Sequence, residues 1–434
     1  MNYQSLATAL SAQKEELARR PALPSCSRRE ERLLKLGSSL AQIVTGIRGC
    51  GKTTLCLNVL RNSGQVFAYV NFADVRLKGC GSADLNTILE CLYLLYGKFS
   101  YLLLDEIGQV ELWEMFANRL LRSGMHLFIT LSNVLDLRGP SATYLTGRFD
   151  LIELYPLSFA EYCAFHQLET DYDTTRRQGL MMGALDDYLH TGGFFQLQGL
   201  SGGRPHQDNE AARSVADPVL HDLQQRHRMR YKADFELLIQ HLLNHAPLAV
   251  NRKKLQRTFA FKSDNTVDNY LSYCQNAFLL CPVPKYSNKI RLRERNDKVY
   301  CCDPALMGSS SDAPLREQTS LRFEIVVAVE LMRRCSRSVC DLYYFKDDVA
   351  EADFVICRGR VALQVVQVCL DLSEKRTLKR EVSGILRAAR VTGCRDLLII
   401  NERERYSIEQ DGFTIKIVPA YAWLLEDEEV DCAQ

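Results

Sequence analysis

The sequence predicts an α/β protein with a parallel sheet at its amino-terminal end, a small module of helices and a hairpin in the middle, and a second α/β domain at its carboxyl-terminal end. The first observation behind this prediction is a glycine-rich loop at residues 46–53 that fits the pattern G-x-x-x-x-G-K-S/T. The second is the alternation of strand-like and helix-like segments through residues 41–166. The third is the length of 434 residues, which is enough for about three domains.

The alternating segments follow one another in the order that a parallel sheet requires. Short apolar runs predict the strands, and longer amphipathic runs predict the helices that join them. The predicted strands are residues 42–45, 66–72, 101–105, 126–131 and 151–155, and the predicted helices are residues 53–60, 85–96 and 111–121. Because helices separate consecutive strands, the strands can all run in the same direction.

The composition is that of an ordinary soluble globular protein, with 47% hydrophobic and 25% charged residues. The chain does not open with an apolar run of signal-peptide type, and no stretch approaches eighteen consecutive apolar residues. Its sixteen cysteines are scattered, with no Cys-x-x-Cys pair and no zinc-type spacing, which indicates reduced core thiols. We therefore expect a cytoplasmic protein without a membrane partner.

The glycine-rich loop has the residues that bind nucleotide phosphates. Its glycines allow the backbone to approach a phosphate closely, and the helix that follows adds a partial positive charge at its amino-terminal end. Lys52 is expected to reach the β and γ phosphates of ATP. The candidate nucleotide-binding residues are Gly46, Ile47, Arg48, Gly49, Cys50, Gly51, Lys52, Thr53 and Thr54.

An acidic strand end supplies the second half of the predicted site. Residues 101–106 read Tyr-Leu-Leu-Leu-Asp-Glu, so two carboxylates follow a buried strand. The Thr53 hydroxyl and Asp105 are the expected Mg²⁺ ligands. Glu106 is then free to polarise the attacking water, which makes Glu106 and Lys52 the candidate catalytic residues. Taken alone, the two carboxylates would better fit a solvated strand end, but beside the phosphate loop they predict a Mg²⁺-dependent ATPase.

The middle of the chain has a different character. Residues 199–213 are expected to be a flexible linker, and residues 214–307 to form a small winged-helix domain, because helices at 234–243 and 266–278 precede a hairpin at 279–300. The net charge of the whole chain is +1, yet residues 226–298 contain fifteen Lys and Arg against six Asp and Glu. This excess suggests contact with double-stranded DNA. A solvated basic face, or a face that docks on an acidic segment such as residues 426–431, explains it equally well.

A second linker is expected at residues 308–320, followed by an α/β domain at residues 321–434. That domain is predicted to contain helices at residues 322–334 and 378–390 and strands at residues 342–345, 352–357, 361–370 and 397–401. The chain before the first linker divides into an amino-terminal helical segment, residues 1–30, and an ATPase domain with a helical extension, residues 31–198.

Several short motifs resemble those of a large prokaryotic family of AAA-like ATPases. Members of this family carry a winged helix and a carboxyl-terminal domain of the restriction-endonuclease fold, and the resemblance extends over nearly the whole chain. It implies a P-loop parallel-sheet ATPase domain, a small winged-helix domain and a C-terminal α/β nuclease-like domain. The matching motifs are Ser132-Asn133, Tyr144-Leu145-Thr146-Gly147-Arg148, the segment from Tyr155 to Tyr162, Thr191-Gly192-Gly193-Phe194, Tyr300-Cys301-Cys302-Asp303, Glu324, Glu351-Ala352-Asp353-Phe354 and Gln367-Val368.

The resemblance also implies roles for individual polar residues. Ser132 or Asn133 would be the polar sensor at the γ phosphate, and Arg148 would act on the phosphates as a catalytic sensor or finger. The alternatives are a helix cap for Ser132 and Asn133, and a surface ion pair for Arg148. If Arg148 acts on a neighbouring subunit, ATP would also promote assembly.

The carboxyl-terminal domain departs from the pattern of active nucleases of this fold. Those enzymes use a helix glutamate, a strand aspartate and a Glu-x-Lys pair to hold Mg²⁺ and activate water. Glu324 and Asp353 would supply the first two, but Gln367-Val368-Cys369 replaces the carboxylate with an amide and the lysine with a thiol. The resemblance therefore implies a vestigial nuclease site at Glu324, Asp353 and Gln367, and we do not expect nuclease activity.

Two functions remain open from the sequence. The first is an AAA-like ATPase that binds ATP and Mg²⁺ and acts as a nucleotide-controlled switch, with its carboxyl-terminal domains contacting a protein partner, a further copy of the chain or nucleic acid. The second is a DNA-binding or DNA-cleaving protein with a PD-(D/E)xK-like domain, in which ATP is accessory. The ATPase is favoured because its residue set is complete.

Overall fold

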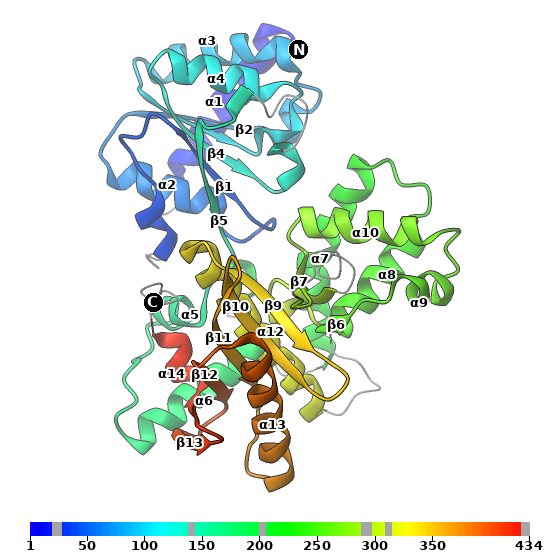
Figure 1. Cartoon of the computed structure of the whole chain (residues 1–434). Helices are drawn as coiled ribbons and strands as arrows, with labels where there is room; N and C mark the ends of the chain where they lie inside the picture. The colour runs from blue at the N-terminus through cyan, green and yellow to red at the C-terminus, as the bar shows by residue number, and fades with distance from the viewer. Residues whose placement is uncertain (20–27, 138–143, 199–204, 288–296, 309–314, 427–434) are drawn as a thin grey trace. The chain divides into compact units, whose positions relative to one another are not determined.

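The chain divides into two compact units in a computed structural model (Figure 1). The structure describes residues 1–19, 28–137, 144–198, 205–287, 297–308 and 315–426. The first unit is built on Met1–Leu154, and the second on Tyr155–Gln275 and Leu279–Gln434. Residues 155–198 therefore group with the second unit, whereas the sequence had suggested a helical extension of the ATPase domain.

A five-stranded parallel sheet forms the centre of the first unit, in the order β2-β3-β4-β1-β5. Apolar side chains fill these strands, as expected for a parallel sheet covered on both faces. Its strands are β1 Ala41–Thr45, β2 Phe67–Asn71, β3 Tyr101–Asp105, β4 His126–Leu131 and β5 Phe149–Glu153. All five strands were predicted from the sequence within two residues of these bounds, so the predicted parallel sheet is confirmed.

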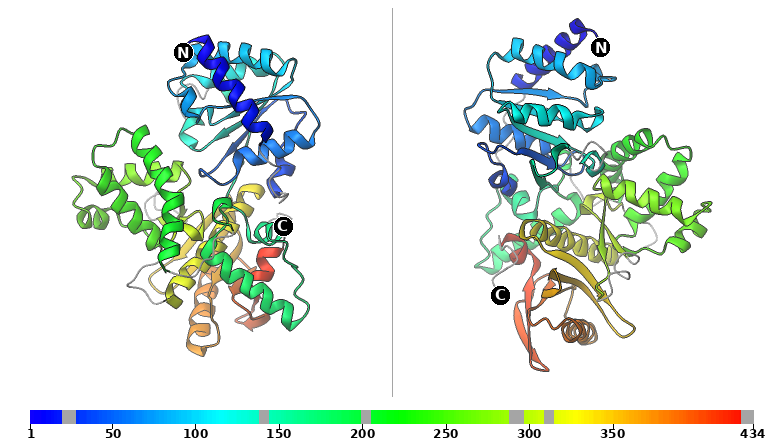
Figure 2. Two further views of the ribbon diagram at one scale, coloured as in Figure 1. Left: turned by 180° about the vertical axis from the view of Figure 1, so that it is seen from behind. Right: turned by 45° about the horizontal axis from the view of Figure 1, so that its top comes forward.

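Four helices complete the first unit. The three helices after the phosphate loop were predicted from the sequence, and the first lies within the expected amino-terminal helical segment. They are α1 Tyr3–Arg19, α2 Lys52–Asn62, α3 Leu85–Tyr96 and α4 Trp113–Arg122. Figure 2 shows α1 lying along the outside of this unit, where it packs against α3 and β2.

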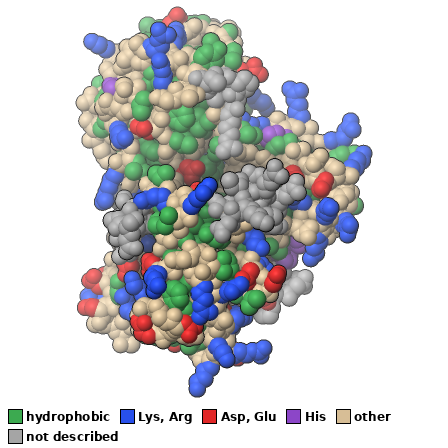
Figure 3. All heavy atoms as spheres, in the orientation of Figure 1, with side chains coloured by type: hydrophobic (Ala, Val, Ile, Leu, Met, Phe, Trp, Pro, Cys, Tyr) green, Lys and Arg blue, Asp and Glu red, His purple; other side chains and the backbone are tan. Residues whose placement is uncertain are grey.

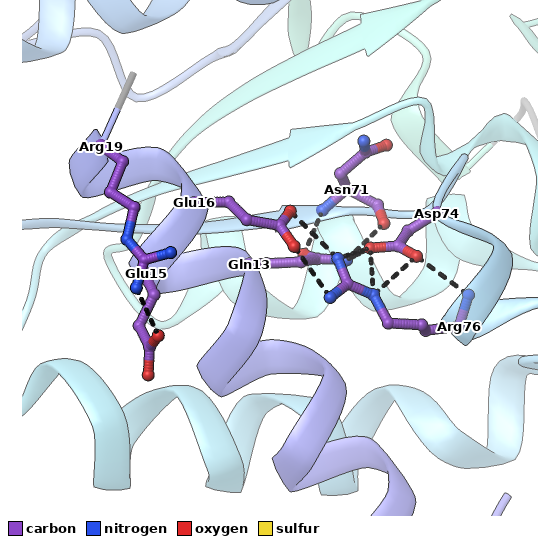
Figure 4. Close-up of polar contacts among 7 residues, drawn as sticks. All are labelled: Gln13, Glu15, Glu16, Arg19, Asn71, Asp74 and Arg76. Carbon is purple, nitrogen blue, oxygen red and sulfur yellow. Dashed lines mark hydrogen bonds and ion pairs between the residues drawn. The ribbon is translucent and has the colours of Figure 1, made fainter. Parts of the chain in front are cut away.

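Polar contacts tie α1 to the carboxyl end of the edge strand β2 (Figure 4). The Gln13 amide donates to the Asn71 carbonyl at 3.0 Å and accepts from the Asn71 N–H at 3.0 Å. Arg76 binds Asp74 at 2.6 Å and Glu16 at 2.9 Å. Because α1 satisfies the open backbone of β2, it is an integral part of the first unit rather than a separate segment.

The second unit contains most of the helices. They are α5 Phe159–Phe165, α6 Thr175–Thr191, α7 Pro205–Arg226, α8 Lys232–Asn244, α9 Arg252–Thr258, α10 Asp264–Asn276, α12 Leu315–Ser338, α13 Lys375–Thr392 and α14 Ala420–Leu425. Two expected linkers are corrected here. Helix α7 begins at Pro205, inside the linker expected at residues 199–213, because proline suits the first position of a helix. Helix α12 begins at Leu315, inside the linker expected at residues 308–320; residues 199–204 and 309–314 lie outside the described part of the chain.

Two sheets accompany these helices. The antiparallel sheet β6-β8-β7 comprises Leu248–Ala249, Asp297–Cys301 and Leu280–Pro284 in that order. The larger mixed sheet has the order β13-β14-β12-β11-β10-β9. Its strands are β9 Asp341–Lys346, β10 Glu351–Arg358, β11 Val361–Val368, β12 Leu397–Asn401, β13 Tyr406–Gln410 and β14 Phe413–Pro419. Helix α13 covers one face of the larger sheet and α12 lies on the other (Figure 2), so the expected carboxyl-terminal α/β domain is present.

Motifs that are far apart in the sequence meet in the interior of the second unit. The Asp303 carboxylate accepts the N–H of Gly193 at 2.8 Å, and the Gly193 carbonyl accepts the N–H of Leu157 at 2.9 Å. A Cβ at Gly193 would lie 2.2 Å from the Leu157 carbonyl oxygen, which explains the glycine. Buried Arg322 of α12 donates to the carbonyls of Pro304 and Met307 at 3.0 and 2.6 Å. Arg322 also donates to the Leu189 carbonyl at 3.2 Å, so residues 155–198 are bound to α12 and to the turn that follows β8, which is why they belong to the second unit.

Asp303 should make the stability of the protein depend on pH. Its burial raises the pKa of the carboxyl to about 7, although the N–H groups of Gly193 and Ala305 oppose this shift. The folded protein therefore keeps a proton that the unfolded chain has lost, and the resulting stabilisation, complete below about pH 4, is lost as the pH rises to about 7.

We expect the free energy of unfolding to fall by at most about 1.4 kcal/mol per pH unit through this group. Urea denaturation at pH 5 and pH 7.5 measures the change, and Asp303→Asn should remove this part of it. The exposed Asp171→Asn variant should keep the wild-type slope. Equal slopes in wild type and Asp303→Asn would show that Asp303 does not titrate in this range.

Candidate active site

The phosphate loop joins the buried strand β1 to α2. Gly46, Gly49 and Gly51 have φ angles of 153°, 87° and 102°, in the region that favours glycine. A Cβ at Gly46 would also lie 2.1 Å from the carbonyl oxygen of Leu154. Neither the backbone path nor the close packing of this loop would accept a larger residue at Gly46.

Lys52 lies inside the loop, with its side chain buried. Its ammonium donates to the carbonyls of Gly46 and Ile47 at 3.0 and 3.1 Å and to the Ser132 hydroxyl at 2.9 Å. It also lies 3.3 Å from Glu106 Oε1. Burial lowers the pKa of Lys52, but the Glu106 carboxylate and other nearby groups outweigh it and the pKa is raised. Lys52 is therefore a permanent cation at the position where phosphate charge would arrive.

The other residues of the loop have different environments. Arg48 is exposed, Thr54 is half-buried and Ile47 is buried. The Cys50 side chain is also buried, which raises the pKa of its thiol. Its carbonyl accepts from the buried guanidinium of Arg28 at 3.2 Å. Sequence reasoning had missed Arg28, which lies well before the motif and has no pattern that would have marked it.

Thr53 and Asp105 meet beneath the loop. The Thr53 hydroxyl donates to Asp105 Oδ1 at 2.7 Å. Thr130 donates to the same oxygen at 2.5 Å, and Tyr69 donates to Asp105 Oδ2 at 3.2 Å. Burial, followed by the neighbouring Glu106, raises the pKa of Asp105. Paired oxygen ligands and a buried negative charge are what Mg²⁺ prefers, so these two residues fit the ion.

Glu106 is held in place rather than free. Its backbone has a φ of 54°, and its N–H donates to Thr130 Oγ1 at 3.0 Å. The Ser132 hydroxyl donates to Glu106 Oε1 at 2.5 Å, and the Ser132 N–H donates to Oε2 at 3.0 Å. Ser132 and Lys52 thus bind the Glu106 carboxylate, and its role as the residue that polarises the attacking water stays a prediction.

Among the contacts that the structure describes, none joins the Asn133 side chain to this cluster. Its Oδ1 atom accepts the N–H of Leu135 at 2.9 Å, which is the capping role considered as the alternative.

Arg148 lies at the amino-terminal end of the strands, whereas the phosphate loop lies at their carboxyl-terminal end. It precedes β5, and Phe149 pairs with Ala41, whereas the loop follows Thr45 at the other end of β1. At about 3.3 Å per residue, five strand residues separate the two by roughly 16 Å. The exposed Arg148 side chain donates to Asn118 Oδ1 at 2.7 Å. Action on the nucleotide of its own chain is incompatible with this placement, so that form of the expectation is corrected.

A second group of carboxylates lies in the second unit, and we call Glu324, Glu351 and Asp353 the carboxylate centre. Glu324 comes from α12, and the other two come from β10. Gln367 of β11 lies beside Asp353, because its Oε1 accepts the Asp353 N–H at 3.2 Å. The structure thus brings the three expected residues together, and it adds Lys298 of β8, which sequence reasoning had assigned only to a basic segment.

Two segments of the chain are similar to known protein families. Residues 38–163 match the family model of an AAA domain, and residues 182–316 match that of a domain of unknown function. The first unit has the fold of AAA-like P-loop ATPases.

An uncharacterized protein of Methanocaldococcus jannaschii is 27% identical over 406 residues, covering 90% of both chains. An uncharacterized protein of Haemophilus influenzae is 26% identical over 399 residues, covering 89% of this chain and 94% of its own.

Solved structures of AAA-type proteins are more distant. The Aeropyrum pernix ORC2 protein has a TM-score of 0.34 and 14% identity, covering 76% of this chain and 94% of its own. The Aeropyrum pernix ORC1 protein in complex with DNA has a TM-score of 0.32 and 14% identity, covering 73% and 94%. The Thermotoga maritima RuvB Holliday junction branch migration motor has a TM-score of 0.28 and 16% identity, covering 63% and 89%. These values are too low to assign an activity.

Two further properties follow from the described residues. Their fourteen cysteines are all free thiols, most of them buried. In the same part of the chain, no helix combines the length and the apolar character that crossing a bilayer requires.

Proposed function

We propose that this protein is a Mg²⁺-dependent ATPase whose nucleotide state controls its second unit. The observation that carries this proposal is the convergence of Lys52, Thr53, Asp105, Glu106 and Ser132 at the carboxyl ends of neighbouring parallel strands. The AAA-domain match over residues 38–163 supports it.

Binding of ATP would rearrange this cluster. The γ phosphate competes with the carbonyls of Gly46 and Ile47 and with Glu106 for the Lys52 ammonium. Thr53 and Asp105 would hold Mg²⁺, which when bound neutralises charge on the phosphate oxygens. Glu106, once released from Lys52, accepts a proton from the attacking water, and Ser132 orients Glu106 or the γ phosphate. Nucleotide binding would thus change the contacts of the residues that carry out hydrolysis. Such a change between the empty and the ATP-bound site is what a switch requires.

Arg148 is proposed to act on a neighbouring copy of the chain. Arg148 is exposed at the amino-terminal end of the strands, and its own phosphate loop lies at their carboxyl-terminal end. Only a second subunit could therefore bring a nucleotide to Arg148. Sedimentation with a non-hydrolysable ATP analogue should then show assembly that Arg148→Ala weakens. A mixture of Arg148→Ala and Lys52→Ala chains should recover turnover that each variant lacks alone, because one mixed interface has both residues intact.

The part formed by α8, α9, α10 and the sheet β6-β8-β7 is proposed to be a winged-helix module that contacts a partner. Figure 3 shows Lys and Arg side chains along this part of the surface. Helix α9 carries four Lys and Arg residues and no acidic residue, although one of them, Arg252, pairs with Asp268 of α10, and α10 carries two aspartates and no cation. A DNA contact would therefore involve phosphates facing α9 rather than bases read by α10.

The test is ATP turnover by the purified protein, with and without Mg²⁺ and with and without duplex DNA at low salt. Turnover that requires Mg²⁺ supports the proposal, and stimulation by DNA identifies nucleic acid as the partner. Limited proteolysis of the apo, ADP and ATP-analogue states tests whether the bound nucleotide changes the conformation of the protein. Identical digestion in all three states would contradict nucleotide control even if turnover is observed.

A further inference from the structure

The ammonium of Lys298 lies among the carboxylates of the second unit. Its Nζ atom is 2.8 Å from Glu324 Oε1, 3.6 Å from Glu351 Oε1 and 3.7 Å from Asp353 Oδ1. Only 11% of the Lys298 side chain is exposed. A surface ion pair contributes little, but an ammonium that is buried among three carboxylates neutralises charge that water does not screen.

The neighbouring polar groups are committed to partners within the protein. The Tyr300 hydroxyl donates to Glu324 Oε1 at 2.8 Å, and the Val368 N–H donates to Asp353 Oδ2 at 2.9 Å. The Gln367 amide accepts from the Asp353 N–H and donates to Glu381 Oε2 at 2.7 Å. Gln367 therefore positions the backbone of β10 and the Glu381 carboxylate of α13. Its amide oxygen is already used by the Asp353 N–H and is not directed at an ion.

The neighbouring carboxylates keep the Lys298 ammonium charged. Burial lowers the pKa of Lys298, but Glu324 and Asp353 outweigh it and raise the pKa above its ordinary value. Lys298 is thus charged at neutral pH, and its attachment to β8 keeps it at high effective concentration beside the carboxylates. With the Lys298 ammonium in place, no group of three or more His, Cys, Asp or Glu among the described residues could hold a metal ion. The residues present do not fit the Mg²⁺ ion that active nucleases of the resembled fold bind.

We propose that Lys298 is a tethered cation that occupies the carboxylate centre in place of a divalent metal ion and joins the β6-β8-β7 sheet to α12 and β10. Lys298 follows Asp297 at the start of β8, and Glu324 and Asp353 lie in separate elements of the six-stranded-sheet region. The Lys298 side chain thereby links the two sheets of the second unit. Its ammonium also prevents a divalent metal ion from binding at the carboxylate centre.

The test compares the melting temperature of nucleotide-free, full-length protein in EDTA and in 1 mM MnCl₂. Mn²⁺ should shift the melting temperatures of wild type and Asp353→Asn equally, because any ion at the phosphate loop is common to both. Lys298→Met, which leaves three carboxylates without their shared cation, should melt about 5 °C or more below wild type in EDTA. Mn²⁺ should recover at least half of that loss by replacing the missing cation, and Lys298→Met/Asp353→Asn should show no recovery.

Lys346→Met is the matched control, because Lys346 binds Glu351 at 2.7 Å but its side chain is 53% exposed. It should neither lower the melting temperature comparably nor create a response to Mn²⁺. An unchanged melting temperature in Lys298→Met, or a loss that Mn²⁺ does not recover, would overturn the proposal.

A second test does not depend on the folding of Lys298→Met. Mn²⁺ binding measured by electron paramagnetic resonance should be the same in wild type and Asp353→Asn, because any ion at the phosphate loop is common to both. Bound Mn²⁺ that Asp353→Asn removes would mean that metal displaces Lys298. Nicking of plasmid DNA by wild type but not by Asp353→Asn would likewise overturn the proposal and make Lys298 part of a nuclease site.

Discussion

Glu106→Gln should bind ATP and lower its turnover number by about 10²- to 10⁴-fold. The amide has the size of the carboxylate but cannot accept the proton of the attacking water. The substitution also releases Lys52, whose Nζ atom lies 3.3 Å from Glu106 Oε1. Affinity for an ATP analogue should therefore be unchanged or increased, and the measurement is steady-state turnover alongside calorimetric binding.

Glu111→Gln is the control for this experiment. Glu111 is an exposed carboxylate shortly after β3, and its substitution should leave both turnover and affinity within twofold of wild type. Turnover of Glu106→Gln within tenfold of wild type would exclude Glu106 as the base. Loss of analogue binding would instead mean that Glu106 maintains the shape of the loop.

Glu330→Gln should destabilise the second unit by about 3–5 kcal/mol. The Glu330 side chain is 2% exposed and forms ion pairs with Arg333 and with Arg334, the latter at 3.0 Å. These arginines donate to backbone carbonyls of two distant segments, Arg333 to Pro156 at 3.0 Å and Arg334 to Trp423 at 2.8 Å. Removing the Glu330 charge deprives two buried guanidinium groups of the carboxylate that pairs with both.

Urea denaturation followed by circular dichroism measures this change. Glu402→Gln serves as the control, because Glu402 pairs with Arg403 across a solvated contact in which the two side chains are 37% and 65% exposed. The control should cost less than about 1 kcal/mol. A similar cost for both substitutions would show that Glu330 does not organise the interior of the second unit.

Local patterns in the sequence were sufficient for much of the fold. Residues 101–105, 126–131 and 397–401 are strands with the predicted bounds, because apolar runs between turns specify buried strands. The linker expected at residues 199–213 was wrong from Pro205 onward. Polar composition was taken to mean loop, but a proline at the first helical position and the burial of Ala212 and Val215 favour a helix there.

The motif residues of the second unit illustrate what a single sequence could not explain. Gly193 and Asp303 were noticed only as a resemblance, and their hydrogen bond across 110 residues shows that they join segments of the interior. Lys298 appeared as one of many cations, because no local pattern distinguishes a solvated lysine from one that reaches carboxylates on other elements.

The sequence by itself determined the phosphate loop, the acidic strand end and the parallel sheet that brings them together. These features depend on short segments whose glycines, charges and apolar periodicity have direct structural meaning. Only the tertiary structure decided that Ser132 holds Glu106, that Arg148 lies away from its own loop, and that Lys298 reaches the carboxylate centre. Each of these depends on contacts between residues distant in the chain, and such contacts are determined by how whole elements pack.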